Sequence, residues 1–320
     1  MHGDCAVGNK RTPIRTGGAG LVTKKSDGRR CMVGSNAPQA AISARSPSLR
    51  QFLNPWHSAG NLWRHRDLIR QFTRREIEGR YRGSFLGLFW SFINPLILLL
   101  IYTFVFGVVF KARWPNARTD NLGEFAITLF CGMTAFNIFG EAIGKAPTLV
   151  VGVPNYVKKV VFPLEVLPVS TLGAALFHAG VSLVILVGAN LLVGGGLPWT
   201  LVLLPLVLLP LLFLSLGLTW FLASLGVFIR DISYTIALVV QVLFFLTPIL
   251  YAVENIPEPY RSLIELNPLT PIIENVRRVV LWGQPPSWLG IGLWSCATGA
   301  VMLLGYAWFM KTKKAFADVI

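Results

Sequence analysis

A stretch without any charged residue, from Val166 to Ile229, most constrains what this chain can fold into. It is too long for one membrane-crossing helix, because a hydrocarbon core of about 30 Å needs only about 20 apolar residues. The glycines and proline of GGGLP at 194–198 predict a break that divides it into two helices. Charged residues make up only 14% of the chain, against about 25% in soluble domains. The sequence therefore predicts an all-α polytopic membrane protein.

The same reasoning predicts six transmembrane helices, the first with a kink at its Asn94-Pro95 pair. An even number places both termini on one side of the membrane. A cytoplasmic location for them leaves fourteen Lys and Arg inside and six outside, before the first residues are counted, as the positive-inside rule requires. We expect an inner-membrane protein with both termini cytoplasmic and spans near 84–110, 124–143, 164–193, 199–228, 232–253 and 288–310.

The N-terminal residues 1–55 have a different composition from the transmembrane domain, which we assign to 60–320. They are basic, rich in Gly, Ser and Pro, and without the apolar core of a secretory signal. Either a disordered cytoplasmic tail or a start codon placed too early explains this composition. The net charge of +14 lies mostly beside the apolar spans, so anionic lipid head groups, and not nucleic acid, are the expected partner.

Three segments outside the spans have amphipathic character. Residues 62–82 mix arginine with apolar residues and predict a helix on the inner leaflet, although a simple topology signal is the alternative. The loop 145–164 predicts a short cytoplasmic helix with an apolar patch for a partner. The proline-rich segment 254–287 contains a candidate helix at Thr270–Trp282 and predicts paired re-entrant half-helices on the outside.

The sequence contains neither the buried charges of an ion-coupled carrier nor a motif that binds ATP. No predicted span carries a Lys, Arg, Asp or Glu in its interior, which disfavours ion-coupled carriers. His178 is expected to be a packing histidine rather than a proton relay, because no acid accompanies it. The nearest approach to a P-loop, GEAIGKA at 140–146, lacks the glycine spacing and the hydroxyl. We expect no cofactor and no enzymatic activity, so the energy must come from another subunit.

Four stretches in matching order resemble the permease subunits of ABC-2 type exporters of O-antigen, capsule and teichoic-acid chains. The resemblance covers roughly residues 60–320. It implies an ABC-2 type (type V exporter) permease fold with an N-terminal interfacial helix and outer re-entrant half-helices. The substrate class comes from this resemblance alone. The stretches are 74–110, 151–170, 230–251 and 267–286.

The resemblance also implies partners and roles for particular residues. Two copies of the permease would pair with two nucleotide-binding subunits, which bind the ATP and Mg²⁺. A coupling helix would dock on the ATPase through Val151, Pro154, Asn155, Tyr156, Lys158 and Lys159. Spans 1 and 5 would line a path between the copies, with Phe89, Trp90, Tyr234 and Phe245 as its candidate wall. Ordinary helix packing and lipid contact are the alternative for these aromatic residues.

A basic cluster before the first span suits the phosphate of the expected substrate, an undecaprenyl-diphosphate-linked glycan. A guanidinium fork matches the geometry of phosphate oxygens. The candidate contacts are Arg74, Arg75, Arg80 and Arg82.

Two other functions remain open at this stage. An ABC-2 exporter of a small molecule or drug would share the architecture. A membrane enzyme acting on lipid-linked sugars would need acids or a metal at the membrane face. The outer glutamates lie among prolines without a companion histidine or arginine-rich pocket, which disfavours the enzyme.

Overall fold

The computed structural model describes residues 55–111, 114, 122–158, 162–193 and 196–320. All regular elements in these ranges are helices, which confirms the all-α prediction. The predicted tail, apart from its last residue, and Lys159 lie outside the described residues.

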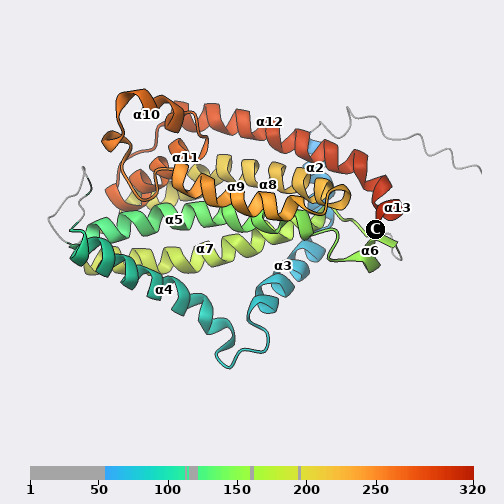
Figure 1. The fold of residues 1–320 in the computed structure, drawn as a ribbon, viewed down its shortest axis with the longest axis horizontal. Helices are drawn as coiled ribbons and strands as arrows, with labels where there is room; N and C mark the ends of the chain where they lie inside the picture. The colour runs from blue at the N-terminus through green and yellow to red at the C-terminus, as the bar shows by residue number, and fades with distance from the viewer. Residues whose placement is uncertain (1–54, 112–113, 115–121, 159–161, 194–195) are drawn as a thin grey trace, which may run out of the picture. The chain divides into compact units, whose positions relative to one another are not determined.

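Six helices run alternately between two ends of one bundle (Figure 1). The C-terminus and the short helices α2 and α6 lie at one end, here called the terminal end, while α10 and α11 lie at the opposite end. The six are α4 (Trp90–Tyr102, continued by a π-helix at Thr103–Val109), α5 (Leu122–Lys145), α7 (Val166–Leu192), α8 (Leu204–Phe228), α9 (Ile232–Leu246) and α12 (Trp288–Thr312).

Five apolar helical segments of the described chain are long enough to cross a membrane. Helix α9, with 15 residues, is shorter than its predicted span of 232–253. It ends because Thr247 is extended, as residues before a proline tend to be, and Pro248 follows. The count of six spans therefore remains a prediction. The five are Gly87–Val109, Gly123–Thr148, Val166–Leu192, Trp199–Phe228 and Trp288–Val319.

Short helices form the segments predicted to lie outside the spans. The amphipathic segment consists of two helices that meet at His65, and the loop after α5 contains the expected short helix. The outer segment carries two short helices, the second of which coincides with the predicted Thr270–Trp282. These elements are α2 (Pro55–Arg64), α3 (Arg66–Tyr81), α6 (Pro154–Lys158), α10 (Glu258–Glu265), α11 (Leu269–Arg277, continued by a π-helix at Arg278–Trp282) and α13 (Phe316–Val319).

Helix α5 forms the centre of the bundle. Its most apolar window is 72% buried, against 11% for the segment that contains α4 and 17% for the segment that contains α12. Helices α4, α7, α8, α9 and α11 all contact α5. The polar residues of α5 therefore face protein and the spaces between helices, and not lipid.

A buried arginine fixes the outer segment to the bundle. The side chain of Arg277 in α11 has no exposed surface. Its guanidinium donates to the carbonyl oxygens of Pro248, Ile249 and Thr128 at 2.8, 2.9 and 3.3 Å, and to the carboxylate of Glu274 at 2.7 Å. It thereby satisfies backbone oxygens just beyond the end of α9, where the helix leaves them without helical partners. The sequence predicted the side of the membrane for this residue but not its burial within the protein.

Helices α8 and α12 approach so closely that their contact requires glycine. A Cβ atom on Gly305 would overlap the backbone carbonyl of Gly217, and a Cβ on Gly217 would lie 2.7 Å from Met302 Cα. Both obstacles are backbone atoms, which cannot move aside as a flexible side chain can. This pair of glycines therefore sets the distance between the two helices.

Replacement of Gly305 by valine should separate α8 from α12 and destabilise the protein by about 1–3 kcal/mol, the usual cost of overpacking. The matched control is Gly292→Val on the same helix, where a Cβ meets nothing within 4 Å. Thermal unfolding of the purified variants in detergent measures the difference. Equal midpoints for the two variants would contradict this account of the interface.

Candidate functional site: a polar cavity beside the first span

A cavity of about 1270 Å³ lies between α3, α4, α5 and α7. Its lining combines charged residues of α3 and α5 with neutral polar and apolar residues of α4 and α7. All of these residues come from one copy of the chain. A space of this size with such a lining is a candidate binding site.

One face of α5 supplies the polar wall of the cavity. Asn137, Glu141 and Lys145 follow one another at intervals of four residues, so they lie on the same side of the helix. Gly140 and Gly144 lie next to the two charged residues and also line the cavity. At Gly144 a Cβ would meet nothing within 4 Å, so there is open space beside Lys145.

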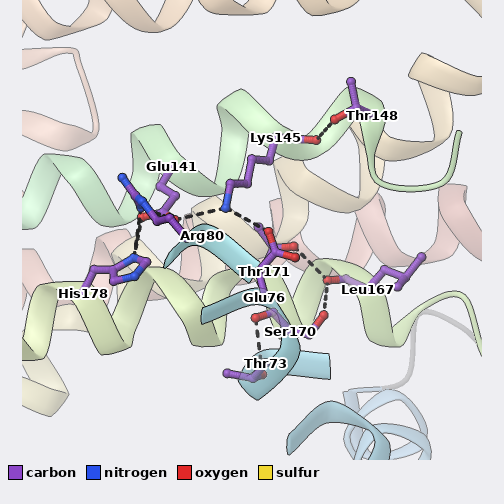
Figure 2. Close-up of polar contacts among 10 residues, drawn as sticks. All are labelled: Thr73, Glu76, Arg80, Glu141, Lys145, Thr148, Leu167, Ser170, Thr171 and His178. Atoms are coloured by element: carbon purple, nitrogen blue, oxygen red, sulfur yellow. Dashed lines mark hydrogen bonds and ion pairs between the residues drawn. The ribbon is translucent and has the colours of Figure 1, made fainter. Parts of the chain in front are cut away.

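Glu141 is the centre of an ion network that joins three helices (Figure 2). Its carboxylate lies 2.9 Å from Arg80 of α3, 3.2 Å from Lys145 of α5 and 3.1 Å from His178 Nδ1 of α7. Lys145 also reaches Glu76 of α3, at 2.9 Å. The side chain of Glu141 is only 15% exposed, so these partners compensate for water that the carboxylate has lost.

His178 completes the junction between α3 and α7. Its Nδ1 lies 3.1 Å from Glu141 and 3.2 Å from Arg80, and the tautomer decides whether it donates to the carboxylate or accepts from the guanidinium. Tyr81 packs edge-on against the imidazole, with ring centroids 5.9 Å apart. Burial raises the pKa of the Tyr81 hydroxyl, which therefore stays neutral at physiological pH. The sequence analysis found no acid for His178, and the structure corrects this.

The end of the cavity nearest α3 carries excess positive charge. Four cations and two carboxylates line it, so the net charge of the lining is positive when His178 is neutral. The carboxylates are already paired within the network. Anions are therefore the ligands that this basic mouth favours. Its charged residues are Arg75, Arg80, Arg82, Lys145, Glu76 and Glu141.

The structure separates the four arginines that sequence analysis grouped together. Arg75, Arg80 and Arg82 line the cavity. Arg74 lies outside the lining, on the exposed side of α3, where it pairs with Glu78 at 2.6 Å. Their contact with phosphate stays a prediction, since the structure contains no ligand.

The residues predicted to couple with an ATPase lie in and before α6. Val151, Pro154, Asn155 and Lys158 are exposed. Tyr156 instead packs against the rings of Phe72 in α3 and Phe162, at centroid distances of 5.8 and 4.9 Å. The loop is thus in direct contact with the helix that carries the basic mouth.

The predicted path residues lie elsewhere, on α9, on α4 and in the 3-10 turn before α4. Phe89, Tyr234 and Phe245 are 62%, 80% and 57% exposed, while Trp90 is half-buried. None of the four lines the cavity. They can form a surface for a second copy or for lipid, and their role as a path stays a prediction.

Sequence reasoning missed the network around Glu141 because it treated this residue as the boundary of a span. The helix instead continues to Lys145, within a candidate span that ends at Thr148. Glu141 and Lys145 therefore both lie within this candidate span. Polar residues four apart at 137, 141 and 145 were the available signal. Among the described residues, no group of three His, Cys, Asp or Glu is placed to hold a metal ion.

Comparison with known proteins gives consistent results. Residues 67–281 match the family described as ABC-2 type transporter. The chain is 31% identical to the O-antigen export system permease protein of Myxococcus xanthus, over 81% of this chain and 97% of that protein. It is 27% identical to a Klebsiella pneumoniae protein of the same description, over 79% and 95% of the two chains. The polysialic acid transport protein of Escherichia coli is 23% identical over 75% and 92%.

Loss of the Glu141 charge should loosen α3 from α5 and α7. In Glu141→Gln, the cations Arg80 and Lys145 lose the carboxylate that they share, which should cost about 1.5–3 kcal/mol, the usual contribution of a hydrogen bond to a charged group. The control is Glu78→Gln, which breaks a pair whose side chains are 59% and 80% exposed, worth less than about 1 kcal/mol. Hydrogen–deuterium exchange should accelerate across α3 only in Glu141→Gln. The same exchange rates in both variants would contradict the role given to the network.

Proposed function

The chain belongs to the ABC-2 type transporter family, and on this premise we propose that it is the membrane-spanning subunit of a bacterial exporter of lipid-linked polysaccharide. As in the relatives, it is a multi-pass permease of the inner membrane and not an enzyme. The observation that carries the proposal is the cavity, whose basic mouth continues into a polar groove between apolar helices. A lipid-linked glycan has three parts that match these three environments. Its diphosphate suits the basic mouth, its first sugar suits the polar groove, and its lipid suits the apolar helices.

The alternatives from the sequence fit the cavity less well. A site for apolar drugs is lined mostly by hydrophobic and aromatic side chains, whereas charged and amide side chains line much of this one. The chain also matches 92% or more of the length of relatives described as O-antigen or polysialic acid transport proteins. An enzyme acting on lipid-linked sugars would need paired acids or a metal. The carboxylates of this cavity are instead held by cations.

Energy for export comes from an ATP-binding ABC subunit, which binds the ATP and Mg²⁺. The exposed residues of the α6 loop are the proposed contact with that subunit. Tyr156 carries displacement of the loop to α3 through Phe72, whose ring also lies under the guanidinium of Arg75 at 4.6 Å. Arg75 in turn lines the cavity. A displacement of α6 by the ATP-binding subunit would therefore move Arg75 of the basic mouth through direct side-chain contacts.

Two further parts of the proposal concern assembly and orientation. Two copies meet along exposed apolar faces of α4 and α9, where Phe89, Trp90, Tyr234 and Phe245 lie. The terminal end faces the cytoplasm, because the arginines of α2 and α3 and the lysines in and just after the last turn of α12 lie there, as the positive-inside rule requires.

Deletion of the gene in its native host should abolish a surface polysaccharide while its lipid-linked precursor accumulates inside. Expression of the wild-type chain should restore export. Restoration should also require an intact ATP-binding subunit, tested with a variant of that subunit's phosphate-binding lysine. A strain that keeps its surface polysaccharides without this chain would refute the proposed substrate.

Charge reversal on the proposed docking loop should weaken binding of the ATP-binding subunit. Lys158 is exposed in α6, and Lys158→Glu should reduce the amount of that subunit recovered by affinity purification several-fold. Lys311→Glu reverses an exposed charge at the same end of the bundle, but on α12, and should leave recovery unchanged. Equal losses in both variants would indicate a general charge effect and remove the support for docking at α6.

Removal of positive charge from the basic mouth should weaken diphosphate binding. Arg75 and Arg82 line the cavity but take no part in the Glu141 network, so the double variant Arg75→Gln/Arg82→Gln should still fold. A charge-assisted hydrogen bond contributes about 1.5–3 kcal/mol, which predicts at least about tenfold weaker binding of farnesyl diphosphate. The control is Arg70→Gln, an exposed arginine of α3 outside the cavity lining. An unchanged affinity in the double variant would refute this contact.

A further inference from the structure

Two side-chain amides line the cavity inside the predicted first and second spans. Asn94 of α4 and Asn137 of α5 are both exposed, and neither forms a hydrogen bond within the described chain. Each carboxamide can donate two hydrogen bonds and accept two. An amide without partners is costly in an apolar environment, so it must face water or a polar ligand.

Other polar groups in the same region also have unused bonding capacity. Pro95 has no N–H, so the carbonyl of Ser91 lacks the donor that a helix normally provides. Both residues line the cavity. His178 Nε2 is buried, and the described chain provides no partner for it. The groove therefore offers several neutral hydrogen-bonding groups on α4, α5 and α7.

The position of the amides relative to the basic mouth suggests what they bind. Asn137 precedes Glu141 by four residues, so it lies about 6 Å farther along α5 from the terminal end. A ligand whose diphosphate contacts the basic mouth would place its next chemical unit at this level. In a lipid-linked glycan, that unit is either the lipid or the first sugar. Carboxamides favour the sugar, because its hydroxyl groups can both donate hydrogen bonds to them and accept hydrogen bonds from them.

We propose that Asn94 and Asn137 form a neutral sugar subsite for the first sugar attached to the diphosphate. The subsite lies within one copy of the chain and not at the contact between two copies. The inference rests on the proposed function and adds to it the part of the substrate that the groove recognises. The cavity, at about 1270 Å³, is larger than the 300–1000 Å³ typical of small-molecule sites, so a sugar and a diphosphate fit together.

The test measures binding of two probes to the full-length chain with its ATP-binding partner in lipid nanodiscs. One probe is farnesyl diphosphate, and the other is farnesyl diphosphate carrying one N-acetylglucosamine. The wild type should bind the sugar-bearing probe more tightly. The double variant Asn94→Leu/Asn137→Leu should lose about tenfold in affinity for that probe, because two or more hydrogen bonds disappear. Its affinity for farnesyl diphosphate should not change.

The matched control is Gln241→Leu. Gln241 is an exposed amide of α9 that does not line the cavity, so its removal should leave both affinities unchanged. Asn137→Gln keeps an amide and should lose less affinity than Asn137→Leu. Thermal unfolding of each variant shows whether the fold is intact.

Three outcomes would overturn the subsite. In the first, sugar adds nothing to wild-type affinity although farnesyl diphosphate binds, which leaves the proposed function standing. In the second, Gln241→Leu weakens sugar binding as much as the double variant, which would place recognition at α9. In the third, neither probe binds the wild type, and the proposed diphosphate contact fails as well.

Discussion

A carboxylate placed inside a membrane-spanning helix must have partners, and this constraint organises the terminal half of the bundle. Glu141 obtains them from α3, from its own helix and from α7. Its carboxylate is only 15% exposed, so these partners replace much of the hydration that it has lost. The network therefore holds α3 against the bundle while the polar cavity beside it remains open. Without this attachment, the arginines of α3 would be an ordinary basic segment at the membrane surface.

Because α3 is held in this way, it lies between the exposed loop and the cavity. Its Phe72 contacts the loop through Tyr156, and its Arg80 contacts Glu141. The two contacts are about two turns of α3 apart. A displacement of Phe72 by the loop would therefore also move Arg80, because a helix of this length is rigid. The face of α3 that carries Arg80 also packs on α7, where a Cβ on Gly173 would lie 2.8 Å from Thr73 Oγ1. This packing leaves α3 little freedom to move except together with α7.

The sequence was sufficient for the parts of the fold that depend on local constraints. The apolar run predicted for 164–193 became α7 at Val166–Leu192, because span length follows bilayer thickness. The early end of α9 was missed, although Thr247-Pro248 carried the signal. The sequence identified the four arginines of the site but could not separate those that line the cavity from Arg74, which lies outside it. Contacts such as Arg80 with Glu141 join residues far apart in sequence, and no single-sequence periodicity encodes them.

Burial of Arg277 limits how the outer end of the bundle can change shape. Its guanidinium donates to three backbone carbonyls, one in α5 and two in the turn after α9. Separation of α11 from α5 would therefore leave a buried cation and these carbonyl oxygens without partners. Widening at this end must therefore move α5, α11 and the turn after α9 as one rigid block. A conformational change of this kind moves the block as a whole and leaves the contacts inside it unchanged.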